Sequence, residues 1–127
     1  MGRMISPGKA EAEAIVSQEP IGFYGGVDIE TGLVIEKDHP LEGECVTGKI
    51  LVFPRGKGST VGSYVIYGLQ KNNVGPTAIV NEETETIVAT GAILAGIPCV
   101  DEIDITQLKT GDVLRVDADK GIVEKID

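Results

Sequence analysis

The sequence has no tryptophan, a single histidine, two cysteines and few aromatic residues, which make up 4% of its 127 positions. So few aromatics disfavour a surface that stacks nucleic-acid bases. Cations are also scarce, with 11 Lys+Arg against 20 Asp+Glu and a net charge of −9, so we expect no nucleic-acid partner. No stretch approaches the ~18 apolar residues that span a bilayer, and no apolar leader follows Met1. We therefore expect a cytoplasmic protein with no membrane partner.

The potential metal ligands are too few for a centre of this chain's own. Cys45 and Cys99 stand far apart with no CxxC motif, and His39 is the only histidine. Structural zinc sites use about four Cys or His ligands, and iron–sulfur clusters usually use about four cysteines. We expect no metal site in this chain, two buried thiols, and a structural turn at His39.

The apolar runs predict one mixed α/β domain over residues 1–127. The expected strands are residues 8–17, 33–35, 45–53, 77–80 and 97–100, with two more in the alternating tail 108–126. The expected helices are residues 60–71, with a buried stripe of Val61, Tyr64, Val65 and Leu69, and residues 84–95, with Ile87, Val88, Gly91, Ala92 and Ala95 on one face. This order implies a small parallel β-α-β-α-β unit packed with a barrel-like β layer.

The charges are unevenly placed along the chain. No acidic residue occurs in residues 46–81, which contain Lys49, Arg55, Lys57 and Lys71, so this segment carries +4 and the rest −13. The segment coincides with the strand, the glycine-rich turn RGKGST and the following helix. Because the start of a helix presents free N–H groups, we expect an anion site at that turn. The turn is neither GxxxxGK[ST] nor GxGxxG, and a plain glycine-rich connection with solvated cations is the alternative.

Ser59 lies in this turn, close to the start of the expected helix. Nearby N–H donors, Arg55 and Lys57 would stabilise a serine alkoxide and lower the pKa of the hydroxyl, which permits a base without histidine. No Ser-His-Asp triad is evident, because His39 belongs to the separate turn DHPL. The alternative is that Ser59 or Thr60 only caps the helix.

Four segments, matching in order and spacing over most of the chain, resemble the aconitase X family. They are FYGGVDIETGLVI at 23–35, HPLEGE at 39–44, GKILVFPRGKGSTVGSYVIY at 48–67 and AGIPCVD at 95–101. The run GKGSTVGS is similar to the glycine–serine loop of aconitase-type swivelling domains. The whole chain resembles the small subunit of the aconitase X family.

The resemblance implies a swivelling β/β/α fold and a hydro-lyase that is active only as a heterodimer with a larger subunit. That subunit would carry a [4Fe-4S] cluster, which accepts the leaving hydroxyl as a Lewis acid. This chain would bind no cofactor by itself. The resemblance makes Ser59 the proton acceptor for the adjacent carbon.

Other residues are expected to support the substrate. Gly56 and Gly58 would permit the turn, while Arg55, Lys57 and Thr60 would hold the anion. The loop with Gly25, Gly26 and Asp28 is a further candidate contact, with either the substrate or the partner subunit.

Members of the family dehydrate mevalonate 5-phosphate to trans-anhydromevalonate 5-phosphate, or cis-3-hydroxy-L-proline. A free-standing small subunit resembles the archaeal type, and a phosphate suits the +4 segment, so we expect the first substrate and a role in isoprenoid synthesis. Aconitases continue their loop with Arg-Glu-His, whereas Val61, Gly62 and Ser63 follow here. A tricarboxylate substrate is therefore not expected.

Other classes of function stay open at this point. One is a hydro-lyase subunit for another hydroxy acid, such as cis-3-hydroxy-L-proline. Another is a non-catalytic swivelling or binding module, including a phosphoryl carrier that would use His39. A third is a purely structural interaction domain in which Ser59 only caps a helix.

Overall fold

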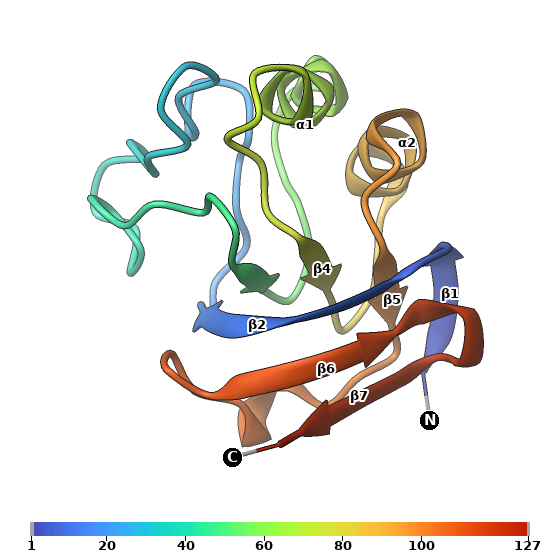
Figure 1. Cartoon of the computed structure of the whole chain (residues 1–127). Helices are drawn as coiled ribbons and strands as arrows, with labels where there is room; N and C mark the ends of the chain where they lie inside the picture. Colours follow the sequence, from blue (N-terminus) through green and yellow to red (C-terminus); the bar gives the residue numbers. More distant parts are fainter. Residues whose placement is uncertain (1, 127) are drawn as a thin grey trace.

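The computed structural model describes residues 2–126, which form one curled seven-stranded sheet with two helices on one of its faces (Figure 1). The strands are β1 (Arg3–Ser6), β2 (Lys9–Val16), β3 (Ile50–Val52), β4 (Ala78–Val80), β5 (Cys99–Asp101), β6 (Val113–Asp117) and β7 (Ile122–Lys125). The helices are α1 (Gly62–Lys71) and α2 (Thr86–Ala95), and two short 3-10 turns are η1 (Ile105–Gln107) and η2 (Ala118–Lys120).

The strand order is β1-β5-β4-β3-β2-β6-β7. Strands β3, β4 and β5 are parallel and are joined through α1 and α2, which confirms the expected β-α-β-α-β unit. The long strand β2 belongs to both halves of the sheet: residues 14–16 pair in parallel with β3, and residues 9–13 pair antiparallel with β6. This shared strand lets the β6–β7 hairpin fold under the parallel unit, giving the expected barrel-like layer.

Apolar packing covers both faces of the central strands. Leu51 of β3 packs with Phe53, Ile66 and other residues in the core beneath the helices. Its neighbours Ile50 and Val52 point to the opposite face, into the core that the curled β6 helps to enclose. Coverage on both faces explains why β3, β4 and β5 consist almost entirely of apolar residues.

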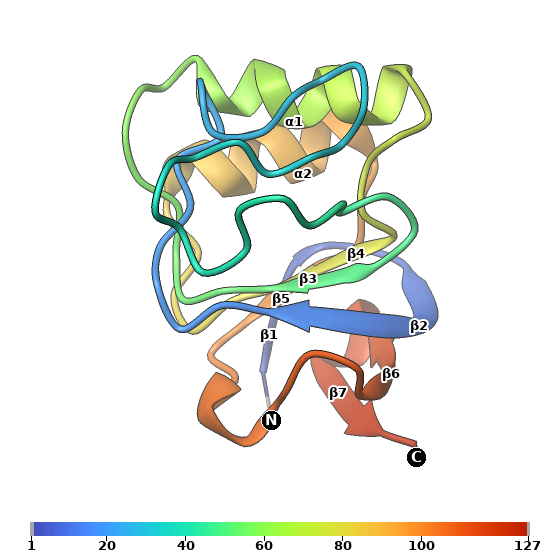
Figure 2. The same cartoon turned by 90° about the vertical axis from the view of Figure 1, so that its left-hand side faces the viewer.

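A long irregular segment, residues 17–49, lies beside α1 and completes the helix layer (Figure 2). It is fixed by buried apolar side chains, namely Ile21, Phe23, Val27, Val34, Leu41 and Val46. The rings of Phe23 and Phe53 meet edge to face, with centroids 5.7 Å apart, and join this segment to the turn after β3. The strand expected at 33–35 is reduced to isolated bridges at Leu33 and Val34.

The prediction of a strand over residues 45–53 is too long, because only Ile50–Val52 form β3. The chain turns immediately before it: Gly48 has a φ of 69°, and the N–H of Lys49 donates to the carbonyl of Val46 at 3.1 Å. Strand β5 begins two residues later than expected, whereas the strands expected at 8–17 and 77–80 and in the tail are confirmed.

The predicted buried stripe of α1 is confirmed at Leu69, which is buried, and in part at Val65, which packs against the core, but it is wrong for Val61 and Tyr64. Val61 and Tyr64 are exposed, and Gly62, Ser63, Ile66 and Leu69 are the buried residues of the helix. Close packing against α2 is the reason, since a Cβ on Gly91 would stand 2.8 Å from the Cβ of Ile66. The small residues of α1 and α2 face each other, which turns the bulkier Tyr64 outward. The apolar face predicted for α2 is confirmed at Val88, Gly91 and Ala92.

Candidate active site

The turn that carries Ser59 leaves the carboxyl end of β3 and is anchored on both sides. The N–H of Ile21 donates to the carbonyl of Arg55 at 3.2 Å, and the N–H of Lys57 donates to the carbonyl of Ile21 at 3.0 Å. On the other side, the carbonyl of Pro54 accepts the N–H of Glu82 at 3.1 Å. These contacts fix the backbone that presents the next residues.

The two glycines of the turn are required for different reasons. Gly58 has a φ of +87°, a backbone conformation that residues with a Cβ rarely adopt, and it has open space around it. Gly56 is buried, and a Cβ there would stand 2.5 Å from Oε1 of Glu85 and 2.8 Å from Cγ2 of Val88. Gly56 therefore permits the turn to approach the start of α2.

Ser59 lies exposed at the end of this turn, but neither it nor Thr60 is the N-cap of α1. The cap position is Val61, which has no side-chain cap hydrogen bond of its own, so the cap lies one or two residues later than predicted, although Ser59 still accepts a hydrogen bond from the first turn. Residues 59–62 form a turn immediately before the helix, in which the N–H of Gly62 donates to the carbonyl of Ser59 at 2.9 Å. The hydroxyl Oγ of Ser59 accepts the N–H of Val61 at 3.1 Å, so a backbone donor is directed at this oxygen.

The positive charge of residues 46–81 is largely offset in the folded chain. Three of its four cations lie against acids from outside the segment. The pairs are Lys49–Glu13 at 2.5 Å, Arg55–Glu82 at 3.8 Å and Lys57–Glu36 at 2.7 Å. A net charge counted along the chain therefore overstates the field at the turn, and the anion site stays a prediction.

Glu36 is a residue that sequence reasoning missed. Its Oε1 accepts the N–H of Gly22 at 2.9 Å, and its Oε2 pairs with Lys57. Partial burial raises the pKa of Glu36, but the hydrogen bonds from Lys57 and Gly22 outweigh burial and hold the pKa below its ordinary value. Glu36 thus links the long irregular segment to the turn that carries Ser59. No local pattern marks it, because its partners are distant in sequence.

The loop with Gly25, Gly26 and Asp28 lies near the start of α1, since a Cβ on Gly62 would stand 3.5 Å from the backbone N of Tyr24. Gly26 leaves no room for a side chain beside the carbonyl of Gly22. The Oδ1 of Asp28 accepts the N–H of Glu30 at 2.8 Å within its own turn. Contact of this loop with a substrate or partner stays a prediction.

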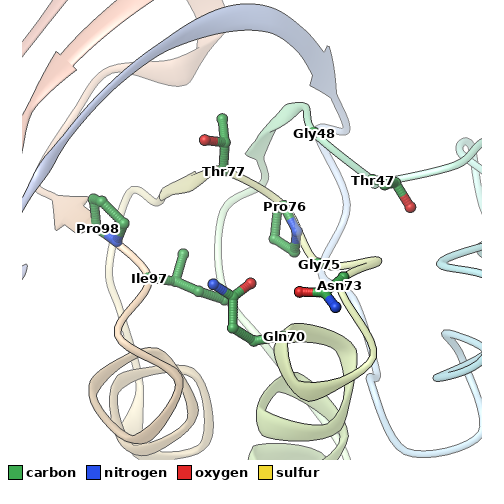
Figure 3. A pocket seen from close by; sticks show the side chains of 9 residues that line it. All are labelled: Thr47, Gly48, Gln70, Asn73, Gly75, Pro76, Thr77, Ile97 and Pro98. Atoms are coloured by element: carbon green, nitrogen blue, oxygen red, sulfur yellow. The ribbon is translucent and has the colours of Figure 1, made fainter.

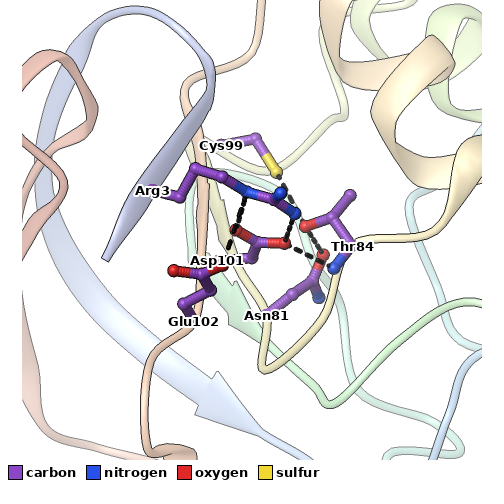
Figure 4. A network of polar contacts seen from close by, with 6 residues as sticks. All are labelled: Arg3, Asn81, Thr84, Cys99, Asp101 and Glu102. Carbon is purple, nitrogen blue, oxygen red and sulfur yellow. Dashed lines mark hydrogen bonds and ion pairs between the residues drawn. The ribbon is translucent and has the colours of Figure 1, made fainter. Parts of the chain in front are cut away.

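A second polar cluster that the sequence did not single out lies at the ends of β4 and β5 (Figure 4). The guanidinium of Arg3 donates to both carboxylate oxygens of the buried Asp101, at 3.0 and 2.7 Å. The hydrogen bond to Asp101 is the main cause that raises the pKa of Arg3 above its ordinary value. The N–H of Thr84 also donates to Asp101 at 2.8 Å, and the Thr84 hydroxyl donates to Asn81 at 2.9 Å. These contacts join β1 to β5 and hold the loop before α2.

His39 is a structural turn residue, as expected. The residue is 7% exposed, its Nδ1 accepts the N–H of Leu41 at 3.0 Å, and its Nε2 lies 3.0 Å from the carbonyl of Pro20. Both ring nitrogens are engaged in contacts with the backbone, whereas a phosphoryl carrier needs one nitrogen free to take up the phosphoryl group.

The expectation of two buried thiols is wrong for Cys45, which is exposed, and right for Cys99. The thiol of Cys45 lies at the outer surface of the irregular segment and donates to Oγ1 of Thr47 at 3.1 Å. Burial is the main cause that raises the pKa of Cys99 to about 12.

Residues 2–126 contain no group of three or more His, Cys, Asp or Glu side chains placed to hold a metal ion. The two cysteines are also fewer than the about four that an iron–sulfur cluster uses, and they lie in different surroundings, Cys99 buried and Cys45 exposed. Over the same residues, every helix is too short or too polar to cross a bilayer.

The surface pockets lie away from most of the predicted site residues. A pocket of about 280 Å³ lies beyond the C-terminal end of α1, where Gln70 and Asn73 approach Thr77, Ile97 and Pro98 (Figure 3). This is the edge opposite to the turn after β3. A groove of about 240 Å³ runs between the starts of α1 and α2, and Thr60 is the predicted site residue that lines it.

Comparison with known proteins gives concordant matches over almost the whole chain. The family model described as "Aconitase X swivel domain" matches residues 1–125. A protein of Thermococcus kodakarensis named "Phosphomevalonate dehydratase small subunit" is 62% identical over 123 residues, which cover 97% of this chain and 92% of that protein. The protein of the same name from Thermococcus onnurineus is 60% identical over 123 residues, covering 97% of this chain and 95% of the relative.

A solved structure agrees with the sequence matches. The crystal structure of Thermococcus kodakaraensis aconitase X in its holo-form superposes with a TM-score of 0.98 at 60% identity, covering 99% of this chain and 96% of that one. The match confirms the expected swivel-domain fold, and the relatives' names confirm the expected enzyme class, a subunit of a dehydratase. By sequence and by structure, the chain belongs to the aconitase X swivel-domain family.

Proposed function

We propose that this chain is the small subunit of a two-chain hydro-lyase that dehydrates mevalonate 5-phosphate to trans-anhydromevalonate 5-phosphate. The observation that carries the proposal is the position of Ser59, exposed at the end of a glycine turn with the Val61 N–H directed at its hydroxyl oxygen. The names of relatives at 60–62% identity support the reaction and the substrate.

The proposed role of Ser59 is to accept a proton from the carbon next to the one that loses its hydroxyl. A serine hydroxyl is a weak base, and its alkoxide must be stabilised before it can do so. The hydrogen bond from Val61 favours the charged oxygen over the neutral one. The anchoring of the turn to Ile21 and Glu82 by backbone hydrogen bonds keeps that oxygen in place.

The proposed substrate carries a phosphate, and Arg55, Lys57 and Thr60 are the proposed contacts. Arg55 and Lys57 stay about half exposed despite their ion pairs, so a phosphate can compete with Glu82 and Glu36 for them. The effect of each cation on binding is therefore expected to be modest. Gly25, Gly26 and Asp28 remain proposed loop contacts.

We propose that the [4Fe-4S] cluster expected for this reaction lies on the larger subunit. The thiols of the described chain do not fit it, as shown above. The relatives are named small subunits, which implies a larger partner. The isolated chain is then expected to have no dehydratase activity of its own.

Ser59→Ala in the reconstituted two-chain enzyme tests the proposal. Loss of a general base lowers rates by about 10²- to 10⁴-fold, so turnover of mevalonate 5-phosphate should fall at least about 100-fold while the two chains still associate. Thr106→Ala, which removes an exposed hydroxyl from η1, is the matched control and should turn over as the wild type does. Full turnover with Ser59→Ala would show that Ser59 is not the base.

The substrate is tested in the same assay by mass spectrometry. Loss of one water from mevalonate 5-phosphate, with no reaction of cis-3-hydroxy-L-proline, is the expected result. Dehydration of cis-3-hydroxy-L-proline alone would assign the chain to another hydroxy acid.

A further inference from the structure

The two helices of the chain are almost free of charge. Of the ten residues of α1 only Lys71 is charged, and none of the ten in α2 is, although charged residues make up 24% of the chain. A helix on the surface of a soluble protein normally carries charged residues on its outer face. The absence of such residues indicates that the outer side of this layer is not exposed to water in the working protein.

Large apolar side chains occupy the outer face in place of charges. They are Val61, Tyr64, Tyr67, Ile93 and Leu94, which we call the helix face. Tyr64 is 68% exposed, Ile93 58% and Leu94 53%. Helix α2 carries no charge on any side: Val88 and Ala92 are buried, Ile93 and Leu94 are exposed, and its polar residues are two threonines, Thr86 and Thr90. A surface helix whose outer side is apolar rather than charged is normally covered on that side.

The helix face contains a depression that reaches the proposed catalytic turn. The groove of about 240 Å³ between the starts of α1 and α2 is lined by Tyr64 and by Ile87 and Thr90, among others. It begins at Thr60, the residue after Ser59. A partner seated in the groove would therefore also lie against the turn that carries Ser59.

Charge complementarity decides between a second copy of this chain and a different partner. The chain carries a net charge of −9, so a second copy would bring the same negative charge against this one. Like charges across an interface are unfavourable. The face therefore fits a partner other than a second copy, with an apolar surface and less negative charge.

We propose that the helix face docks the larger subunit of the dehydratase, with Tyr64 and the inter-helix groove at its centre. This inference rests on the proposal above that the chain works with a larger subunit. Docking there would cover the exposed apolar side chains. It would also bring partner residues to Ser59, which by itself lies on an open surface.

The double variant Tyr64→Glu/Ile93→Glu tests the docking surface, with the dissociation constant for the larger subunit as the measurement. Both side chains are mostly exposed, so the variant should fold, which circular dichroism and melting temperature will check. Buried aromatic residues commonly dominate interfaces. We expect the dissociation constant to rise about 100-fold, and a rise of less than tenfold would overturn the proposal.

Met4→Glu is the matched control, because Met4 is an apolar side chain of β1, 47% exposed and outside the helix face. It should bind the larger subunit within threefold of the wild type. Ser59→Ala should also bind normally while losing turnover, so failure of the docking surface is distinguishable from failure of the catalytic assignment. If Met4→Glu raised the dissociation constant as much as the double variant does, the helix face would not be the docking surface.

Hydrogen exchange of the wild-type chain gives a second measurement that needs no variant. Residues 86–95 should exchange more slowly in the complex than in the isolated chain. Unchanged exchange there would overturn the proposal. Sedimentation equilibrium of the chain alone should give a monomer, and a homodimer that the double variant dissociates would assign the face to a second copy.

Discussion

Gly56→Ala should destabilise the chain through one specific contact, between the turn that carries Ser59 and the start of α2. The new Cβ would stand 2.5 Å from Oε1 of Glu85, which is too close for a methyl carbon and an oxygen that are not bonded. That oxygen accepts the N–H of Val88 at 3.1 Å, and Oε2 of the same side chain accepts the N–H of Ile87 at 2.8 Å. Glu85 can move away only by giving up its capping of α2.

The cost has two parts that the structure separates. Loss of a helix cap costs about 1 kcal/mol. The new methyl group would also stand 2.8 Å from Cγ2 of Val88, and a shift of that buried side chain costs about 1 kcal/mol more. The total is about 2 kcal/mol, and at about 4 °C per kcal/mol for a chain of this length the melting temperature should fall by about 8 °C.

The assay is a double-mutant cycle with Glu85→Ala, measured by urea unfolding. Glu85→Ala alone should cost about 1 kcal/mol, the value of the cap. Once the carboxylate is gone, Gly56→Ala has only Val88 to displace, so the double variant should also lose about 2 kcal/mol rather than 3. Gly58→Ala is the matched control, because its cost of about 1 kcal/mol comes from its positive φ and should simply add to that of Glu85→Ala.

Two results would refute this reasoning. A loss below about 0.5 kcal/mol for Gly56→Ala would mean that the turn moves away from α2 at little cost. Additive losses in the double variant would mean that Glu85 is not what the new methyl group displaces.

Two further predictions concern titratable groups. A maleimide at pH 7 should label one thiol of the native chain, the exposed Cys45, because Cys99 is buried with a pKa of about 12; Cys45→Ser should then take up no label, and two labelled thiols in the native wild type would contradict this. The pKa of Glu36 is held below its ordinary value of 4.5, so its stabilisation should be complete above pH 4.5 and lost as the pH falls through the lowered value. The stability advantage of the wild type over Glu36→Gln, measured by urea unfolding, should shrink over that acidic range, and an advantage that grows there would show that the ion pair with Lys57 is not its source.

Local sequence was sufficient for the elements whose pattern depends on near neighbours. The alternation in residues 8–17 and in the tail, the apolar face of α2, and the order of strands and helices after residue 45 all appear in the structure, whereas strand β1 was not predicted. The glycine turn with Ser59 was also placed correctly at the end of β3. Periodicity places Leu69 of α1 correctly but fails for Val61 and Tyr64, because close contact with Gly91 of α2 decides which side of the helix is buried there.

The sequence by itself determined the fold class, the family resemblance and the serine turn, because each is carried by residues adjacent or regularly spaced along the chain. Only the tertiary structure decided the charge around that turn. Glu36 and Glu82 come from other segments to lie against Lys57 and Arg55, so a count along residues 46–81 does not give the local field. The tertiary structure also decided which side of α1 faces outward, and with it the apolar face next to Ser59. Both depend on contacts between segments distant in sequence, which no local pattern records.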